Sequence, residues 1–280
     1  MPLPAVLLSA KRMSAHQFVA LTLANLRMII RDRVLHGVLG VAGVMLVLVP
    51  AFSSFSMRQS QEVAISLSLS AISLVLMVLT LLLGTSSIWR DIERRYTASI
   101  MTLPVSRVIY LLGKFAAMAL FLLICAVILT AAGSLVVLLA ATQYPSDLPI
   151  SWGTIALAVL ADLVKYLLLG GIAILLSTVS TSFFLPFFGT LAIYLAGSAS
   201  QEVFEYVSGQ FGQEIPALSL AAIKGTYYLL PNFAAFNFKV HAVYALQVQP
   251  GSVVFACIYA ATYTGLLLIL AAWSFNRRAL

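Results

Sequence analysis

Two ionisable side chains lie inside one of the long apolar runs of this 280-residue sequence. Asp162 and Lys165 are three residues apart, so on a helix they share one face and can form an ion pair. Ionisable groups in such runs are costly to bury and often line a path for ions or polar molecules. The pair can equally serve to neutralise itself, and both interpretations stay open.

Residue patterns for catalysis or metal binding are missing from the sequence. The nearest approach to a nucleotide-binding G-x-x-x-x-G-K-[ST] loop is Gly113-Lys114, but Phe115 stands where the loop needs Ser or Thr. The three histidines lie in separate segments, and H-E-x-x-H, C-x-x-C and G-x-S-x-G do not occur. We therefore expect a chain that is not an enzyme and that carries no cofactor or metal of its own.

The elements that must position these residues are membrane helices. Hydrophobic residues make up 62% of the chain and charged residues 9%, whereas a soluble domain carries about 25% charged residues. The apolar runs are continuous and not alternating, which favours helices over a β-barrel. The sequence thus predicts an all-α integral membrane protein, with one transmembrane domain over residues 1–280 and no nucleotide-binding domain. Its six predicted spans cover residues 34–56, 63–88, 108–141, 153–177, 183–200 and 251–275.

The basic residues set the predicted orientation of these spans. With the N-terminus in the cytosol, most of the 16 Lys and Arg fall in the inside connections, as the positive-inside rule requires. The outside connections then hold only Arg58, Lys224 and Lys239. We expect a multi-pass protein of the cell inner (plasma) membrane, with both termini cytoplasmic and no nucleic-acid partner. The inside group is Lys11, Arg12, Arg27, Arg31, Arg33, Arg90, Arg94, Arg95, Arg107, Lys114, Arg277 and Arg278.

Residues 14–33 have the pattern of an amphipathic helix ahead of the first span. Apolar residues including Phe18 and Leu26 fall on one arc, and Arg27 and Arg31 fall on the other. Such a helix lies along the cytosolic face of the bilayer with its arginines toward lipid phosphates. It is either a simple anchor or a lever on the first span.

The connection between the second and third spans, residues 89–107, concentrates charge in a chain that otherwise has little. Its charged part can extend the preceding helix into the cytosol, and Ile100, Met101 and Leu103 can bury one face of a short helix. Pro104 stops that helix, and Ser106 can cap the next one. The segment is either a cytosolic helix lying across two spans or a solvated loop without a partner.

The segment from residue 198 to residue 250 is too long for a passive turn. Pro216, Gly225 and Pro231 interrupt any single helix, which favours short interfacial or re-entrant helices over a seventh span. The segment is interpreted either as a cap over an exit path or as a structural lid. In the first span, small residues at 37, 40 and 43 permit close helix packing, within the chain or in a dimer.

The second-to-third connection resembles the central signature of the type 2 ATP-binding-cassette (ABC) exporter permeases. In that family an acidic residue is commonly followed by Arg-Gly-Thr, then by Leu-x-x-x-P-V-S-R, and then by Gly-Lys. Here Arg94, Arg95, Tyr96 and Thr97 replace the usual glycine-bearing run, so the local turn differs. The residues that carry the resemblance are Asp91, Glu93, Ser99, Leu103, Pro104, Val105, Ser106, Arg107, Gly113 and Lys114.

The resemblance implies a non-catalytic permease that forms half of the membrane part of an exporter. Two such chains, identical or homologous, would work in the bilayer with two copies of a separate ATPase subunit, which binds ATP and Mg. Residues 14–33 would be the connecting helix, and the L-L-P-N-F stretch would belong to an extracytoplasmic re-entrant region. The residues to which the resemblance assigns ATPase coupling are Asp91, Glu93, Arg94, Arg95, Tyr96, Ser99, Ile100, Leu103 and Pro104.

Two functions of other classes compete with this interpretation. In the first, the chain is an autonomous secondary transporter or channel that uses Asp162 and Lys165 as an ion or proton relay. An internal inverted repeat would favour it, and residues 34–141 and 153–275 show no convincing one. In the second, the chain is a membrane assembly factor that transports nothing.

Overall fold

The computed structural model describes residues 3–31, 33–56, 59–93, 106–143, 148–209 and 216–277. Within these ranges the chain is helical and contains no strand, which confirms the all-α prediction. The helices are α1 (Leu3–Arg31), α2 (Val34–Ser54), α3 (Ser60–Glu93), α5 (Arg107–Gln143), α6 (Trp152–Val179), α7 (Phe184–Ser208), α8 (Ala217–Leu229), the 3₁₀ helix η2 (Ala234–Phe236), α9 (Lys239–Val243) and α10 (Pro250–Arg277).

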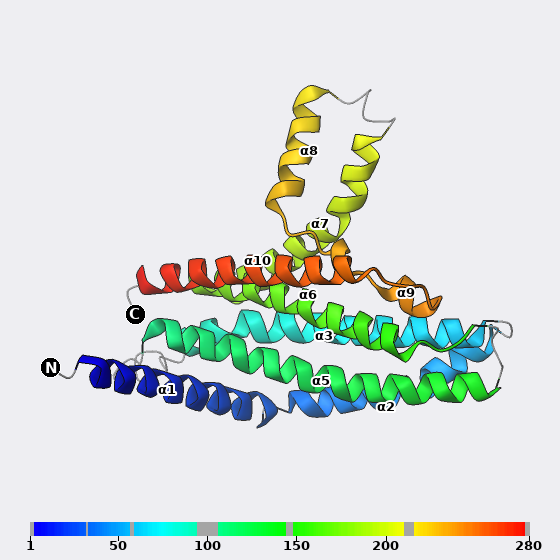
Figure 1. The fold of residues 1–280 in the computed structure, drawn as a ribbon, viewed down its shortest axis with the longest axis horizontal. Helices are drawn as coiled ribbons and strands as arrows, with labels where there is room; N and C mark the ends of the chain where they lie inside the picture. Colours follow the sequence, from blue (N-terminus) through cyan, green and yellow to red (C-terminus); the bar gives the residue numbers. More distant parts are fainter. Residues whose placement is uncertain are drawn as a thin grey trace.

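Five of these helices are long and apolar enough to cross a membrane, namely α2, α3, α5, α6 and α10. Their backbone groups are paired within each helix, which is the condition for crossing a bilayer core. They run side by side as a layered bundle in the order α2, α5, α3, α6 and α10 (Figure 1). The chain is therefore a multi-pass helical membrane protein.

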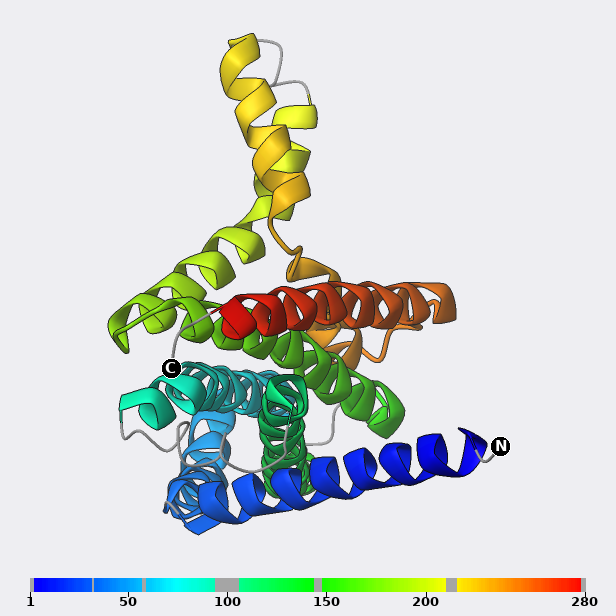
Figure 2. The ribbon, with the colours of Figure 1, turned by 90° about the vertical axis from the view of Figure 1, so that its left-hand side faces the viewer.

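The fifth predicted span, residues 183–200, differs from the other five. It lies in α7, which continues to Ser208 and is not among the described helices that are apolar enough to span. The physical reason is the polar stretch from Ser198 to Glu205, which lowers the hydropathy of the second half of the helix. That half and α8 project away from the bundle as an arm (Figures 1 and 2). The predicted count of six spans is thus not confirmed, because five of the described helices are long and apolar enough to span.

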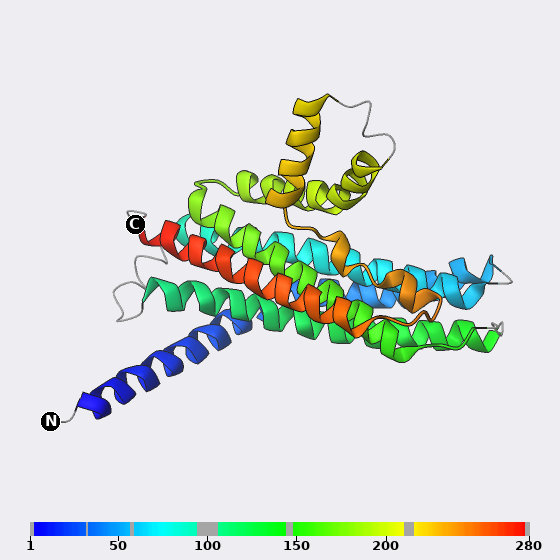
Figure 3. The same ribbon diagram turned by 45° about the horizontal axis from the view of Figure 1, so that its top comes forward.

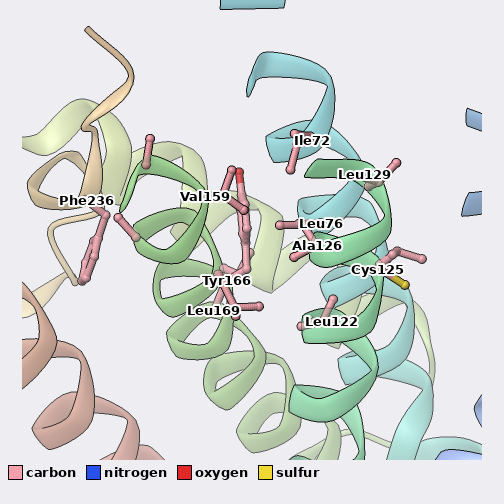
Figure 4. Close-up of a cluster of buried hydrophobic side chains, with 14 of the residues drawn as sticks. Ile72, Leu76, Leu122, Cys125, Ala126, Leu129, Val159, Tyr166, Leu169 and Phe236 are labelled. Carbon is pink, nitrogen blue, oxygen red and sulfur yellow. The ribbon is translucent and has the colours of Figure 1, made fainter. Parts of the chain in front are cut away.

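Close backbone approach fastens α3 to α6 in the middle of the bundle. A Cβ atom added at Gly84 would lie 2.6 Å from the Cβ of Ala173, and one at Gly170 would lie 2.3 Å from the Met118 side chain. Both distances are shorter than ordinary van der Waals contact, so a side chain at Gly84 would clash with the fixed Cβ of Ala173, and one at Gly170 would force the flexible end of Met118 to move. Side chains from α3, α5 and α6 fill the adjoining core, with Tyr166 at its centre and Phe236 of η2 at its edge (Figure 4).

The two ends of the bundle differ in charge. At one end the C-termini of α3, α6 and α10 meet the N-terminus of α5, and Arg90, Arg107, Lys114 and Arg277 gather there. We call it the basic end; it lies on the left in Figure 1. At the opposite end, Gln61 near the start of α3 donates a hydrogen bond to the carbonyl of Leu148, ahead of α6. Successive connections between the long helices lie at alternate ends of the bundle, in the order predicted from the sequence.

Helix α1 diverges from the bundle axis and packs on α5 (Figures 2 and 3). It begins at Leu3, well before the predicted residue 14, and ends at Arg31. Between α1 and α2, Arg33 has a positive φ of 60°, a left-handed conformation that turns the chain. The helix therefore reaches the first apolar span through a tight turn.

The segment before α10 packs deep against the bundle. A Cβ atom added at Gly197 of α7 would lie 2.4 Å from the carbonyl oxygen of Pro231, so the chain crosses α7 at its backbone. The backbone N–H of Asn232 donates to the Tyr259 hydroxyl on α10, and Phe233 is 2% exposed. Short helices were predicted here and are found, but the expectation that Gly225 interrupts a helix was wrong because it lies inside α8.

Candidate functional site

Charged and aromatic side chains of α3 and α5 meet at the basic end. The Lys114 ammonium lies 2.5 Å from a carboxylate oxygen of Asp91, and their side chains are 8% and 13% exposed. The Tyr110 hydroxyl donates a hydrogen bond to the same carboxylate. The Lys114 ammonium also donates to the carbonyl of Ser87. A buried ion pair needs such additional hydrogen bonds to offset the loss of hydration, and both partners have them.

The sequence brings these groups together through simple helix geometry. Tyr110 and Lys114 are four residues apart on α5 and share one face, and the ammonium lies 5.3 Å from the centre of the Tyr110 ring. Between them, Gly113 faces α1, where an added Cβ atom would lie 3.2 Å from the Cβ of Leu21. Helix α1 is therefore packed directly behind the ion pair.

Arg107 ties the same end of α5 to the C-terminus of α10. Its guanidinium donates hydrogen bonds to the carbonyls of Phe275 and Asn276, over 3.0 and 3.2 Å. The last carbonyls of a helix have no partner within it and carry partial negative charge, so a cation is favoured there. The rings of Tyr110 and Phe275 stack with centroids 6.0 Å apart. We call Asp91, Arg107, Tyr110, Lys114 and Phe275 the junction.

The hydroxyl of Ser177 on α6 bonds the backbone near the end of α3. Ser177 Oγ accepts from the backbone N–H of Trp89 over 3.2 Å and donates to the carbonyl of Thr85 over 3.0 Å. These two backbone groups are four residues apart and pair directly in a regular turn. The last turns of α3 are thus held by α5 on one side and by α6 on the other.

The predicted ATPase-coupling residues divide between the described chain and the rest. Asp91 is in the junction, and Glu93 is the exposed last residue of α3. Ser106 accepts a hydrogen bond from the N–H of Ile109, which confirms its prediction as a helix cap. The others, Arg94, Arg95, Tyr96, Ser99, Ile100, Leu103 and Pro104, lie outside the described residues.

A groove of about 670 Å³ opens beside this end of α3. It is lined by Trp89 and Glu93 of α3, by residues 180–183 between α6 and α7, and by Phe184 at the start of α7. The rings of Trp89 and Phe183, which both line it, are in contact with centroids 5.8 Å apart. The groove therefore adjoins the point at which the chain leaves α3.

Asp162 and Lys165 form the ion pair that their spacing predicts. The Lys165 ammonium lies 2.5 Å from Asp162 Oδ1, and both side chains are less than 10% exposed. A second cation, Lys239 of α9, lies 4.0 Å from Asp162 Oδ2. Next to the pair, the hydroxyl of Tyr166 is 2.7 Å from that of Ser73 on α3. The three charged residues are called the charge cluster below.

The amphipathic pattern of α1 holds in its described second half. Phe18 is half-buried, and Leu26 packs against the hydrophobic core. Arg27 and Arg31 are exposed on the other side. The apolar face therefore contacts α5 as well as the surroundings, which a helix lying on lipid alone would not do.

Sequence reasoning missed Tyr110, Phe275 and Lys239. The four-residue spacing of Tyr110 and Lys114 on one helix face was a usable signal. Lys239 joins Asp162 across 77 positions of sequence, and Phe275 is far from α5 in the chain. No local pattern indicates either contact.

Comparison with known proteins assigns the chain to a protein family. A family model described as ABC-2 family transporter protein matches residues 19–280. The chain belongs to this family, which also confirms the resemblance noted in the sequence. It is thus a membrane permease of the ABC transporter class, a non-catalytic transport subunit of the kind that generally works with an ATPase partner. Among curated proteins, no sequence matches.

Proposed function

We propose that this chain forms half of the substrate path of an ABC exporter and is driven by a separate ATPase subunit. Two permease chains and two ATPase subunits make the working transporter, and ATP and Mg bind to the ATPase. The basic end and both termini face the cytoplasm of a cell whose inner membrane holds the protein. Residues 94–105, between α3 and α5, bind the ATPase, and we call them the coupling segment.

The observation that carries this proposal is the junction. Asp91 lies near the end of α3 and Arg107 at the start of α5, so the junction holds both ends of the coupling segment. Contacts of these residues reach α10, and α1 packs behind them. A force on the segment therefore moves several helices together instead of bending a free loop. Such rigid-body motion is a common way to exchange inward-open and outward-open states.

A small-residue face on α2, uncovered within the described chain, is evidence for a second permease chain. An added Cβ atom at Gly37, Gly40 or Gly43 would meet nothing within 4 Å among the described residues. Small residues at helical spacing let two membrane helices approach closely. Within the described chain nothing uses this face, which fits a contact between two permeases.

The test replaces residues 94–103 by a Gly–Ser sequence of equal length. The chain is purified from its own membranes, and ATP hydrolysis that co-elutes with it is measured. We expect the replacement to abolish co-elution, whereas replacement of residues 210–215 in the predicted outer connection leaves it intact. Gel filtration and thermal unfolding check that both variants stay folded.

Two results would contradict the proposal. One is full ATPase binding by the folded variant that lacks residues 94–103. The other is cargo transport by the purified chain alone in vesicles, which would favour the autonomous transporter.

A further inference from the structure

The charge cluster contains one acid and two bases. Asp162 pairs with Lys165 at 2.5 Å and with Lys239 at 4.0 Å. In the described part of the chain, no other carboxylate forms an ion pair with either lysine. With all three groups ionised, the cluster carries one excess positive charge. Asp162 and Lys165 form a buried pair, so the excess charge lies toward Lys239, whose side chain is 28% exposed.

The surroundings of the cluster are largely buried. The Asp162 side chain is 4% exposed and that of Lys165 is 9% exposed. Phe238 and Ala242, which flank Lys239 on its segment, are buried. Tyr166 contributes a ring 4.6 Å from the Lys165 ammonium, and the Tyr194 ring lies 6.2 Å from that of Tyr166. In such apolar surroundings the attraction between unlike charges is strong.

Lys239 provides the way in. Its side chain is 28% exposed, so the excess charge is reachable from the side of α9. Its backbone is held in place, because α9 packs on α3 and α6 and the preceding residues are fixed by α7 and α10. Asp162 is about 15 Å along α6 from its start at Trp152, at 1.5 Å per residue. The cluster therefore lies along the side of α6 and not at its end.

We propose that Lys239 and Lys165 form a binding site for one oxyanion, a phosphate or carboxylate group, with Asp162 holding the two ammonium groups in place. The ligand is the acidic group of a lipid or of a small soluble anion. This site does not depend on the coupling of the chain to an ATPase.

Native mass spectrometry of the full chain in detergent tests the site. Wild type is titrated with phosphatidylglycerol, with phosphatidylcholine and, separately, with inorganic phosphate. We expect one saturable phosphatidylglycerol or phosphate adduct and no matching phosphatidylcholine adduct. Saturation by phosphatidylglycerol alone identifies a lipid headgroup, and saturation by phosphate identifies a soluble anion.

Variants locate the adduct. Lys239→Gln should weaken anion binding at least tenfold, and Lys239→Arg should keep it within about threefold, because a guanidinium also binds oxyanions. Lys224→Gln is the matched control, since it removes one charge from α8 without touching the cluster, and binding should not change. Equal anion affinity in wild type and Lys239→Gln, or no saturable adduct in wild type, would overturn the proposal. Lys165→Gln tests the same site from α6, and it should also weaken anion binding.

Discussion

The junction and the charge cluster are both buried ionic groups, yet they are built differently. In the junction one acid, Asp91, faces one base, Lys114, and hydrogen bonds from Tyr110 and to the Ser87 carbonyl complete the pair. In the charge cluster one acid faces two bases from different elements. The Asp91–Lys114 pair is electrically balanced, and the charge of Arg107 faces the last carbonyls of α10, whereas the cluster has one base more than it has acids.

This difference indicates two kinds of role. A balanced and fully hydrogen-bonded pair fixes the relative positions of helices and has little further capacity for a ligand. An unbalanced cluster is held together by the acid that its two bases share and retains attraction for another anion. The junction is therefore expected to respond to substitution mainly in stability and coupling, and the cluster in ligand binding as well.

The largest effect is expected from Asp162→Asn, which leaves two ammonium groups close together without a counter-charge. Loss of one partner from a buried ion pair costs about 3–5 kcal/mol, so the variant should unfold at clearly lower SDS concentration than wild type. Saturating phosphatidylglycerol or phosphate should restore part of the difference if the cluster binds an anion.

The same variant separates the cluster from a proton relay. A relay predicts that Asp162→Asn stops flux while stability and assembly remain as in wild type. An unfolding curve unchanged from wild type would contradict the structural role argued here. The control for Asp162→Asn is Glu202→Gln, which removes an exposed acid from the arm. Gln201 is not used for this purpose, because its side-chain carbonyl accepts a hydrogen bond from Asn232.

A smaller loss is expected from Lys114→Met in the junction. Asp91 then keeps the hydrogen bond from Tyr110 and is 13% exposed, so water can reach it in part. We expect a loss of about 2–3 kcal/mol in the free energy of unfolding, somewhat less than the roughly 3–5 kcal/mol that breaking a fully buried pair costs. The measurement is SDS unfolding followed by tryptophan fluorescence.

The double variant Asp91→Asn with Lys114→Met provides the control for this prediction. It removes both charges, so much of the lost stability should return. Equal losses in the single and double variants would mean that the ion pair does not hold the junction together.

The sequence was sufficient for the helices and for contacts within one helix. Continuous apolar runs predicted α2, α3, α5, α6 and α10, and three-residue spacing predicted the pair of Asp162 and Lys165. Contacts between distant segments were not accessible, because periodicity reports which face of a helix is apolar and not which partner covers it. Lys239 is the clearest case, since an isolated lysine in a mixed segment resembles any solvated charge. The arm was missed for a related reason: the polar second half of α7 was expected to be separate from the span.

The smallest predicted effect is a change in the free energy of unfolding with pH, which arises from Lys239 in the charge cluster. Burial lowers the pKa of Lys239, Asp162 opposes this shift, and Lys165 adds to it. A lysine with a lower pKa in the folded state binds fewer protons there than in the unfolded chain, so the free energy of unfolding rises with pH. This rise occupies the window between its folded pKa and the ordinary value of about 10.4.

The rise should be below about 1 kcal/mol, because the Lys239 side chain is 28% exposed and partly screened by solvent. It is measured as the difference between wild type and Lys239→Gln in SDS unfolding from neutral pH toward the ordinary lysine pKa. A bound anion favours the charged lysine, so saturating phosphate should shrink this difference. Identical pH dependence in the two proteins would mean that Lys239 senses its neighbours no more in the folded state than in the unfolded chain. Asp162 and Lys165 would then form a simple pair like Asp91 and Lys114.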